Sequence, residues 1–141
     1  MASRYKLEVD ATIENLKQVM DFVNEPLAQA SCPAKVQMQM ELAVEEIFVN
    51  IANYAYAPGK GTATILLELQ KEPFLMTITF IDHGVAYNPL EKEDPDVNLS
   101  AADRPIGGLG IFLTKELMDH VSYEYKNGQN FLTLTKSLRE T

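Results

Sequence analysis

The sequence has few of the residues that mark secreted, metal-binding or nucleic-acid-binding proteins. Its 141 residues include one cysteine, Cys32, which excludes an intramolecular disulfide framework and cannot by itself supply a cysteine-based metal site. Lys and Arg total 12 against 20 Asp and Glu, and the charge of −8 argues against a general binder of nucleic acid or anionic membranes. No apolar run approaches about 18 residues, and the N-terminus lacks a signal-peptide core. We therefore expect a cytoplasmic protein.

Several common catalytic signatures are also missing. The sequence contains no G-x-x-x-x-G-K-[ST] phosphate loop, no H-R-D or D-F-G kinase signature, and no G-x-S-x-G nucleophile elbow. The two histidines, His83 and His120, lie far apart, and neither has a second ligand at a metal-site spacing. We expect both histidines to serve at the surface or in packing. A nucleotide, if one binds, is therefore not held by a phosphate loop of that kind.

What the chain does contain is an ordinary globular pattern, with 46% hydrophobic residues and clear alternation between periods of two and 3.6. The pattern predicts the order β-α-α-β-β-lid-α-β-β in a single domain, 1–141. We expect an α/β (α+β) two-layer sandwich, a mostly antiparallel sheet covered on one face by three helices. The expected elements are a strand over 3–9, a helix from about residue 12 that Pro26 and residues 30–33 punctuate, a helix over 33–57, strands over 62–70 and 74–81, a helix over 107–119, and strands over 121–125 and 131–136. Asn127-Gly128 predicts a type I′ hairpin between the last two strands.

The segment from about 84 to 106 shows neither period. It contains Pro89, Pro95 and Pro105, and acidic residues outnumber basic ones. Because a run of this length without regular structure is uncommon in a compact domain, we interpret it as a functional loop or lid.

Three sets of residues could carry chemistry, and the first lies on the helix expected over 33–57. Val36, Met40, Val44, Ile47, Ile51 and Ala55 form its apolar stripe. Glu46, Asn50 and Asn53 follow along one flank of that stripe, whereas Glu45 points toward solvent. A carboxylate and a carboxamide one turn apart can supply a general base and an oxygen ligand for Mg²⁺. Polar residues at the boundary of the core are the alternative reading.

The second set is Asp82 and Gly84, at the end of the strand over 74–81. An aspartate there can accept a hydrogen bond from an amino group such as that of adenine, and a glycine lets the backbone approach a flat ring. The alternative is a simple D-x-G turn that ends the strand.

The third set is the run from Arg104 to Gly110, with glycines at 107, 108 and 110 before a helix. Free amides at a helix start bind phosphate, and Arg104 could add a charge-assisted bond to a terminal phosphate. The alternative is a hinge with close helix–sheet packing.

Taken together, these sets resemble the GHKL (Bergerat-fold) ATPases, and among them the bacterial anti-sigma-factor serine kinases. Residues 45–56 (EEIFVNIANYAY) match the family's N-box, residues 82–89 (DHGVAYNP) its adenine box, and residues 104–119 (RPIGGLGIFLTKELMD) its glycine-rich box. The resemblance implies ATP/ADP and Mg²⁺ as cofactors. It implies that Glu46 is the catalytic base, Asn50 the Mg²⁺ ligand, and Asp82 the adenine reader. The remaining nucleotide-binding positions that it implies are Asn53, Gly84, Arg104, Gly107, Gly108, Leu109 and Gly110.

The resemblance also implies an activity and partners. The activity is ATP-dependent phosphorylation of a Ser or Thr on a small antagonist protein of the STAS type, with a sigma factor as second partner and a homodimer as the assembly. One position departs from the family pattern, because Tyr54 stands where many members carry histidine. Two alternatives stay open: a nucleotide-gated binding module with little or no phosphotransfer, and a relative of the fold that binds no nucleotide.

Overall fold

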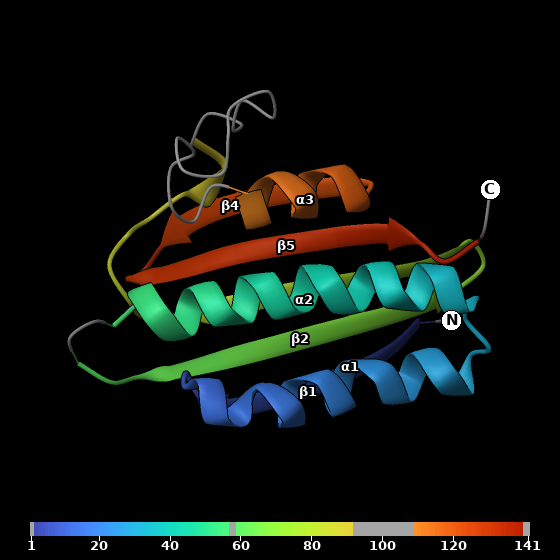
Figure 1. Cartoon of the computed structure of the whole chain (residues 1–141), viewed down its shortest axis with the longest axis horizontal. Coiled ribbons are helices and arrows are strands. Elements are labelled where there is room, and N and C mark those ends of the chain that lie inside the picture. The colour runs from blue at the N-terminus through green and yellow to red at the C-terminus, as the bar shows by residue number, and fades with distance from the viewer. Residues whose placement is uncertain (1, 57–58, 92–108, 140–141) are drawn as a thin grey trace.

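The computed structural model describes residues 2–56, 59–91 and 109–139, apart from the side chain of Leu109. The strands and helices follow the predicted order (Figure 1). They are β1 (Ala2–Asp10), α1 (Leu16–Gln29), α2 (Ala34–Tyr54), β2 (Thr62–Lys71), β3 (Phe74–Asp82), α3 (Leu109–Leu117), β4 (His120–Lys126) and β5 (Gln129–Ser137), with short 3-10 helices η1 (Ile13–Asn15) and η2 (Pro89–Glu91).

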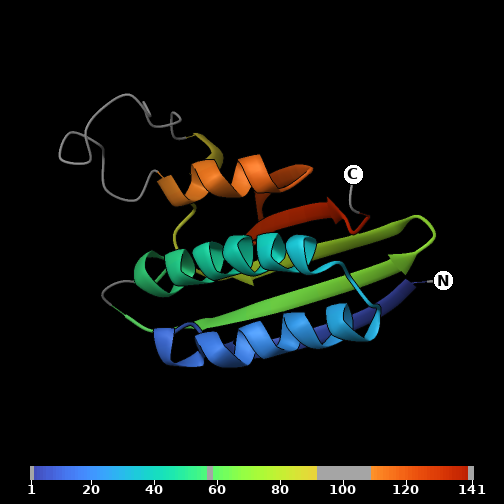
Figure 2. The same ribbon diagram turned by 45° about the vertical axis from the view of Figure 1, so that its right-hand side comes forward.

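The five strands form one sheet in the order β1-β2-β3-β5-β4, and every neighbouring pair is antiparallel. The three helices lie along one face of this sheet, with α2 between α1 and α3 (Figures 1 and 2). The predicted two-layer sandwich is therefore confirmed. The central pairing of β3 with β5 sets Asp82 directly opposite Asn130, on the face that the helices cover.

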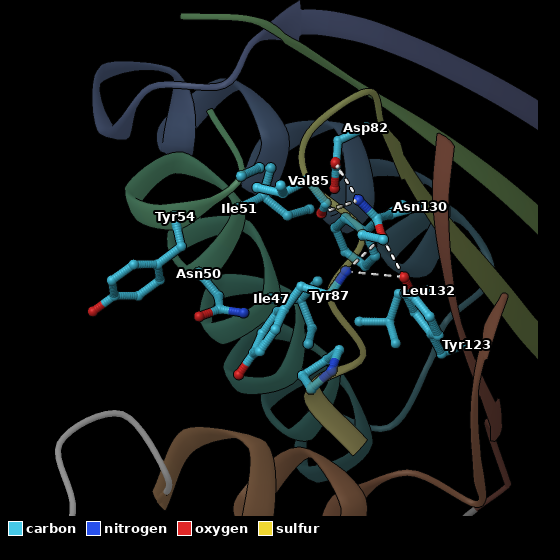
Figure 3. Close-up of a pocket in the computed structure, with 14 residues that line it drawn as sticks. Ile47, Asn50, Ile51, Tyr54, Asp82, Val85, Tyr87, Tyr123, Asn130 and Leu132 are labelled. Atoms are coloured by element: carbon cyan, nitrogen blue, oxygen red, sulfur yellow. Dashed lines mark hydrogen bonds between the residues drawn. The ribbon is translucent and has the colours of Figure 1, made fainter. Parts of the chain in front are cut away.

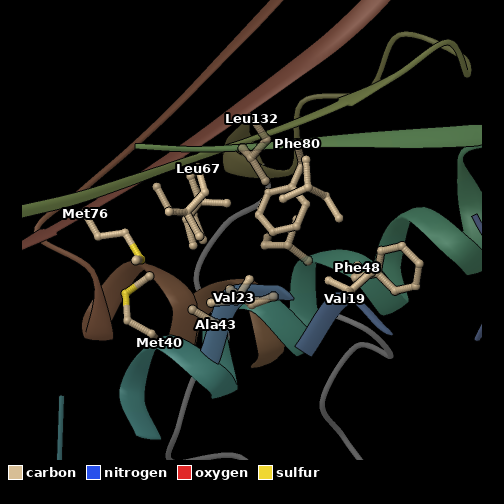
Figure 4. Close-up of a cluster of buried hydrophobic side chains, with 14 of the residues drawn as sticks. Val19, Val23, Met40, Ala43, Phe48, Leu67, Met76, Phe80 and Leu132 are labelled. Carbon is tan, nitrogen blue, oxygen red and sulfur yellow. The ribbon is translucent and has the colours of Figure 1, made fainter. Parts of the chain in front are cut away.

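The core lies between the helices and the sheet, where alternate strand residues meet the apolar stripe of α2 (Figure 4). Ile65, Leu67, Ile78 and Phe80 are each at most 1% exposed. The predicted stripe residues Val36, Met40, Val44, Ile47 and Ile51 are all buried, and Ala55 is half-buried. Burying each such side chain stabilises the fold by about 1.5–3 kcal/mol, so this layer fixes α2 firmly on the sheet.

The first helix differs from the prediction at Pro26. This residue lies inside α1 and does not interrupt it, because the helix continues to Gln29 and Ala30 N–H donates to the Pro26 carbonyl at 3.0 Å. The helix ends at Gln29, directly before the predicted break over residues 30–33, and Ser31 has a φ of 58°, in the left-handed region. Ser31 N–H then donates to Ala28 and Cys32 N–H to Leu27, which is the hydrogen-bond pattern of a Schellman cap.

Two loops bear on the site. Asn127 and Gly128 have φ values of 54° and 75°, so the predicted type I′ hairpin is confirmed. The segment predicted as a lid contains the short helix η2, in which Leu90 N–H donates to Asn88 Oδ1 at 2.9 Å. The rest of that segment, beyond residue 91, lies outside the described residues. Within the described part of the chain, none of the helices has both the length and the apolar character needed to cross a membrane.

Candidate functional site

A largely apolar pocket of about 470 Å³ opens between α2, the ends of β3 and β5, β4, and the loop after β3 (Figure 3). This volume is within the usual range of small-molecule sites. Among the described residues it is lined by Ile47, Asn50, Ile51, Tyr54, Ala55, Phe80, Asp82, Val85, Ala86, Tyr87, Pro89, Tyr123, Asn130 and Leu132. The pocket therefore collects two of the residues singled out from sequence, Asn50 and Asp82, from elements about thirty residues apart.

Asp82 is the buried charged group of this pocket, with 6% of its surface exposed. Its Oδ1 accepts hydrogen bonds from the Gly84 N–H at 2.8 Å and from Asn130 Nδ2 at 2.9 Å. No hydrogen bond within the described part of the chain uses its second oxygen, Oδ2. The pocket thus offers a carboxylate oxygen to a ligand that carries an N–H group.

Asn130 on β5 holds this corner of the pocket together, and the sequence analysis did not single it out. Its amide contacts Asp82, Val85, Tyr87 and Tyr123 (Figure 3). The signal was present in the alternation of the strand, since Asn130 shares a face with the buried Leu132 and Leu134. A polar residue at an inward-facing position needs hydrogen-bond partners, and here they come from the site.

Asn50 lines the pocket from α2, one turn after Glu46, as predicted for that flank of the helix. Asn53, the third member of the flank, is exposed and is not among the lining residues. Tyr54, at the departure from the family pattern, is 57% exposed, and its ring points away from Asp82 (Figure 3).

Glu46 lies outside the pocket lining and is half-buried against the first turn of α3. A Cβ atom built on Gly110 would be 1.7 Å from Glu46 Oε1. The two residues expected to serve as base and phosphate-binding glycine are thus in contact. Gly110 is held in turn by Thr114, whose hydroxyl donates to the Gly110 carbonyl at 2.9 Å.

Gly84 packs against the end of α2. A Cβ on Gly84 would be 2.2 Å from the Ala55 carbonyl oxygen, and the next residue, Val85, donates its N–H to that oxygen at 3.3 Å. The close approach that requires glycine here is to the α2 backbone. A contact between Gly84 and a bound base stays a prediction.

Tyr56 also holds the segment around Asp82 and Gly84 in place. Its hydroxyl donates to the Thr62 carbonyl at 2.6 Å and accepts the His83 N–H at 2.7 Å, so it links the start of β2 to the end of β3. Its ring fills the space beside Gly61, where a Cβ would be 2.3 Å from ring carbons. Burial raises the pKa of Tyr56, and the hydroxyl keeps its proton in the neutral range.

The remaining predicted site residues belong to the glycine-rich run. Arg104, Gly107 and Gly108 lie outside the described residues, and Leu109 begins α3. Among the described residues, no group of three or more His, Cys, Asp or Glu side chains lies together as a metal site. Asn50 lines the pocket and its side chain carries an amide oxygen, which suits Mg²⁺, because this ion commonly takes few protein ligands together with substrate phosphates and water.

The chain is also similar in sequence to two named protein kinases. The chain is 28% identical over 129 residues to the serine/threonine-protein kinase BtrW of Bordetella bronchiseptica, across 92% of this chain and 90% of that protein. It is 31% identical over 104 residues to the serine-protein kinase RsbW of Bacillus mycoides, across 71% of this chain and 63% of that protein, so it spans less than two thirds of that relative.

A solved structure with the RsbU and RsbW domains of a Mycobacterium tuberculosis protein shares the fold, with a TM-score of 0.67 at 18% identity, across 95% of this chain and 32% of the other. The histidine kinase-like ATPase domain matches residues 9–136. That match covers the three helices, the pocket, β2, β3, β4 and all of β5 except Ser137, but only the last two residues of β1. The chain therefore belongs to the histidine kinase-like ATPase domain family.

Proposed function

We propose that this chain is an ATP-dependent serine/threonine protein kinase that acts as an anti-sigma regulatory factor. Its substrate is a small antagonist protein of the STAS type, and it also binds and sequesters a sigma factor. The names of the kinases BtrW and RsbW support the reaction class. The observation that carries the proposal is the apolar pocket with the Asp82 carboxylate at its end, because Oδ2 is left for a ligand N–H group.

The pocket and α2 suit a nucleoside triphosphate that is bound in one orientation along the helix. The adenine end lies at Asp82 and Ala55, and Glu46 is nine residues before Ala55, the residue that follows α2. This separation is about 13.5 Å along the helix axis at 1.5 Å per residue. Asn50 lies between them. This spacing matches an extended nucleotide with its base at Asp82 and its terminal phosphate near Glu46 and Gly110.

The chemistry then falls to residues at the phosphate end. Glu46 accepts the proton of the substrate hydroxyl while the hydroxyl oxygen attacks the terminal phosphorus of ATP. The bond from that phosphorus to the bridging oxygen breaks, and ADP leaves. Asn50 would hold Mg²⁺, and this ion when bound neutralises phosphate charge. Arg104 and the amides of Gly107, Gly108 and Gly110 would bind phosphate oxygens, so most of the rate gain comes from positioning and charge.

Calorimetry with Mg-ADP, followed by incubation with Mg-ATP and candidate STAS-type proteins, tests this proposal. We expect saturable ADP binding and a phosphate-sized gain in the intact mass of one candidate. ADP binding without any mass gain across the candidates would favour a nucleotide-gated binding module. Absence of ADP binding at millimolar concentration would overturn the proposal and favour a relative of the fold that binds no nucleotide.

A further inference from the structure

The Asn130 side chain is almost fully buried, with 6% of its surface exposed, and it uses its whole hydrogen-bonding capacity. An amide has two N–H donors and a carbonyl oxygen with two lone pairs. Nδ2 donates to Asp82 Oδ1 and to the Val85 carbonyl, both at 2.9 Å. Oδ1 accepts the Tyr87 N–H at 3.2 Å and the hydroxyl of Tyr123. The network therefore fixes both the position of this amide and which of its ends faces Asp82.

This network determines how the Asp82 carboxylate is oriented toward a ligand. Its Oδ1 accepts two N–H groups, from Gly84 and Asn130. Turning the carboxylate plane away from these donors would break both bonds in a buried site, and a buried polar group without its partner costs free energy. Asn130 thus helps to keep the other oxygen, Oδ2, in a fixed direction for a donor in the pocket.

The same amide sets the wall of the pocket opposite α2. Val85 and Tyr87 both line the pocket, and both are bound to Asn130 through their backbone groups (Figure 3). The hydroxyl of Tyr123 also accepts the Tyr87 N–H at 3.1 Å, which ties β4 to this wall. One side chain from β5 therefore controls both the acceptor that reads the ligand and the distance to the facing wall.

We propose that Asn130 is a positioning residue that determines specificity for a purine with an exocyclic amino group, by holding Asp82 Oδ2 and the Val85–Tyr87 wall in place. This inference rests on the proposed nucleotide site. It makes a claim that a purely structural role for Asn130 does not make: its loss weakens binding of ligands that present the amino group more than binding of ligands that lack it.

The test compares two ligands by calorimetry, ADP and purine riboside 5′-diphosphate, which lacks the exocyclic amino group. We expect the wild-type protein to prefer ADP by roughly 10-fold or more, and Asn130→Ala to reduce ADP affinity by a similar factor. The affinity for the analogue falls by a smaller factor, because the analogue loses only the support of the wall, so the preference for ADP is reduced. Equal losses for the two ligands, or an unchanged preference, would overturn the proposal.

Thr133→Ala is the matched control. Thr133 hydrogen-bonds Thr79 at 3.2 Å across the same two strands, but on the face of the sheet away from the pocket. The substitution Thr133→Ala removes one hydrogen bond between side chains of neighbouring strands, and we expect it to leave the preference for ADP unchanged. Loss of the preference in this control would show that weakened β3–β5 pairing is sufficient, and the proposal would be wrong.

Amide hydrogen exchange provides a second readout that needs no nucleotide. The Tyr87 amide exchanges faster in Asn130→Ala than in wild type. If Asn130→Ala does not fold, Tyr123→Phe replaces it, because this change removes one hydroxyl and keeps the ring; it too accelerates exchange at Tyr87. Unchanged exchange would overturn the anchoring role even where ADP binds. If the wild-type protein binds no ADP but the variants still exchange faster at Tyr87, the anchoring role is supported. The proposed function and the specificity role would then both be wrong.

Discussion

Glu46 lies between the two helices that border the phosphate end of the proposed site. Its carboxylate occupies the space beside the Gly110 backbone, in the first turn of α3. A carboxylate is favoured at a helix N-terminus, where the backbone amides carry partial positive charge. A phosphate group would be favoured there for the same reason. The side chain expected to act as base is thus already at the position where the terminal phosphate is expected.

Glu46→Gln should separate binding from catalysis. The amide has the shape of the carboxylate and still fits beside Gly110, but it does not accept the substrate proton. We expect nearly unchanged ADP affinity and phosphotransfer reduced by roughly 10²-fold or more, measured by the rate of mass gain in the antagonist protein. The exposed neighbour Glu45 provides the control, Glu45→Gln, with an expected rate close to wild type. Full activity in Glu46→Gln would remove this residue from the base role.

Tyr123 adds a pH dependence to the stability of the same network. Burial raises the pKa of Tyr123 above its ordinary value of 10.0, although the Tyr87 N–H that its hydroxyl accepts acts in the opposite direction. The folded protein therefore holds this proton more tightly than the unfolded chain. The resulting stability is fully present below about pH 10 and is lost as the pH rises through the folded pKa.

Urea unfolding between about pH 8 and pH 11 tests this sign. The difference in the free energy of unfolding between wild type and Tyr123→Phe should be constant up to about pH 10 and then shrink, because phenylalanine has no proton to lose. Lysines titrate in both proteins and cancel in the difference. A difference that grows above pH 10 would contradict the direction of the shift.

At the scale of elements, the β4–β5 hairpin carries Asn130 into the site, and its turn depends on Gly128. Gly128 has a φ of 75°, and nothing lies within 4 Å of the place where its Cβ would be. A substitution there costs backbone strain and creates no clash. Gly128→Ala should lower the free energy of unfolding by about 1 kcal/mol, and Gly128→Asn by less, because Asn tolerates the left-handed region. Equal costs in urea unfolding would rule out backbone strain as the cause.

The elements that the sequence predicted well are those with a strong local pattern. The alternation in β2 and β3, the apolar stripe of α2 and the Asn-Gly turn each bury one face or require one backbone conformation, so the order of elements followed. The place where α1 ends, next to residues 30–33, was predicted, but the continuity of the helix through Pro26 and the conformation that ends it were not. Ser31 takes the left-handed conformation that usually marks glycine, and Pro26 is accommodated one turn before the helix end.

The site was predicted less completely than the fold, for a physical reason. Asn50 and Asp82 could be identified because each lies at a recognisable place on its own helix or strand. Asn130 and Tyr123 act through contacts across the sheet, and those contacts depend on the register of β3, β5 and β4. Gly84 shows the same limit, since its packing against Ala55 joins two segments that only the tertiary fold brings together.

At the scale of the whole molecule, the charge of the protein opposes its proposed ligand. The net charge is −8, and no Lys or Arg is among the described residues that line the pocket. A nucleoside triphosphate is itself strongly negative, so the long-range electrostatic field of the protein repels it during approach. Binding must then depend on short-range contacts at the phosphate end and on a divalent cation that reduces the ligand's charge.

This opposition of charges predicts the salt dependence of nucleotide association. In stopped-flow experiments with EDTA, the association rate of ATP should rise by about two- to threefold as ionic strength increases from about 0.02 M to 0.15 M, because salt screens the repulsion. With Mg²⁺ the rate should be higher and its salt dependence weaker, and uncharged adenosine should show none. A rate that falls with salt in EDTA would mean that local positive charge outside the described residues, with Arg104 as the first candidate, outweighs the net charge of −8 in steering the ligand.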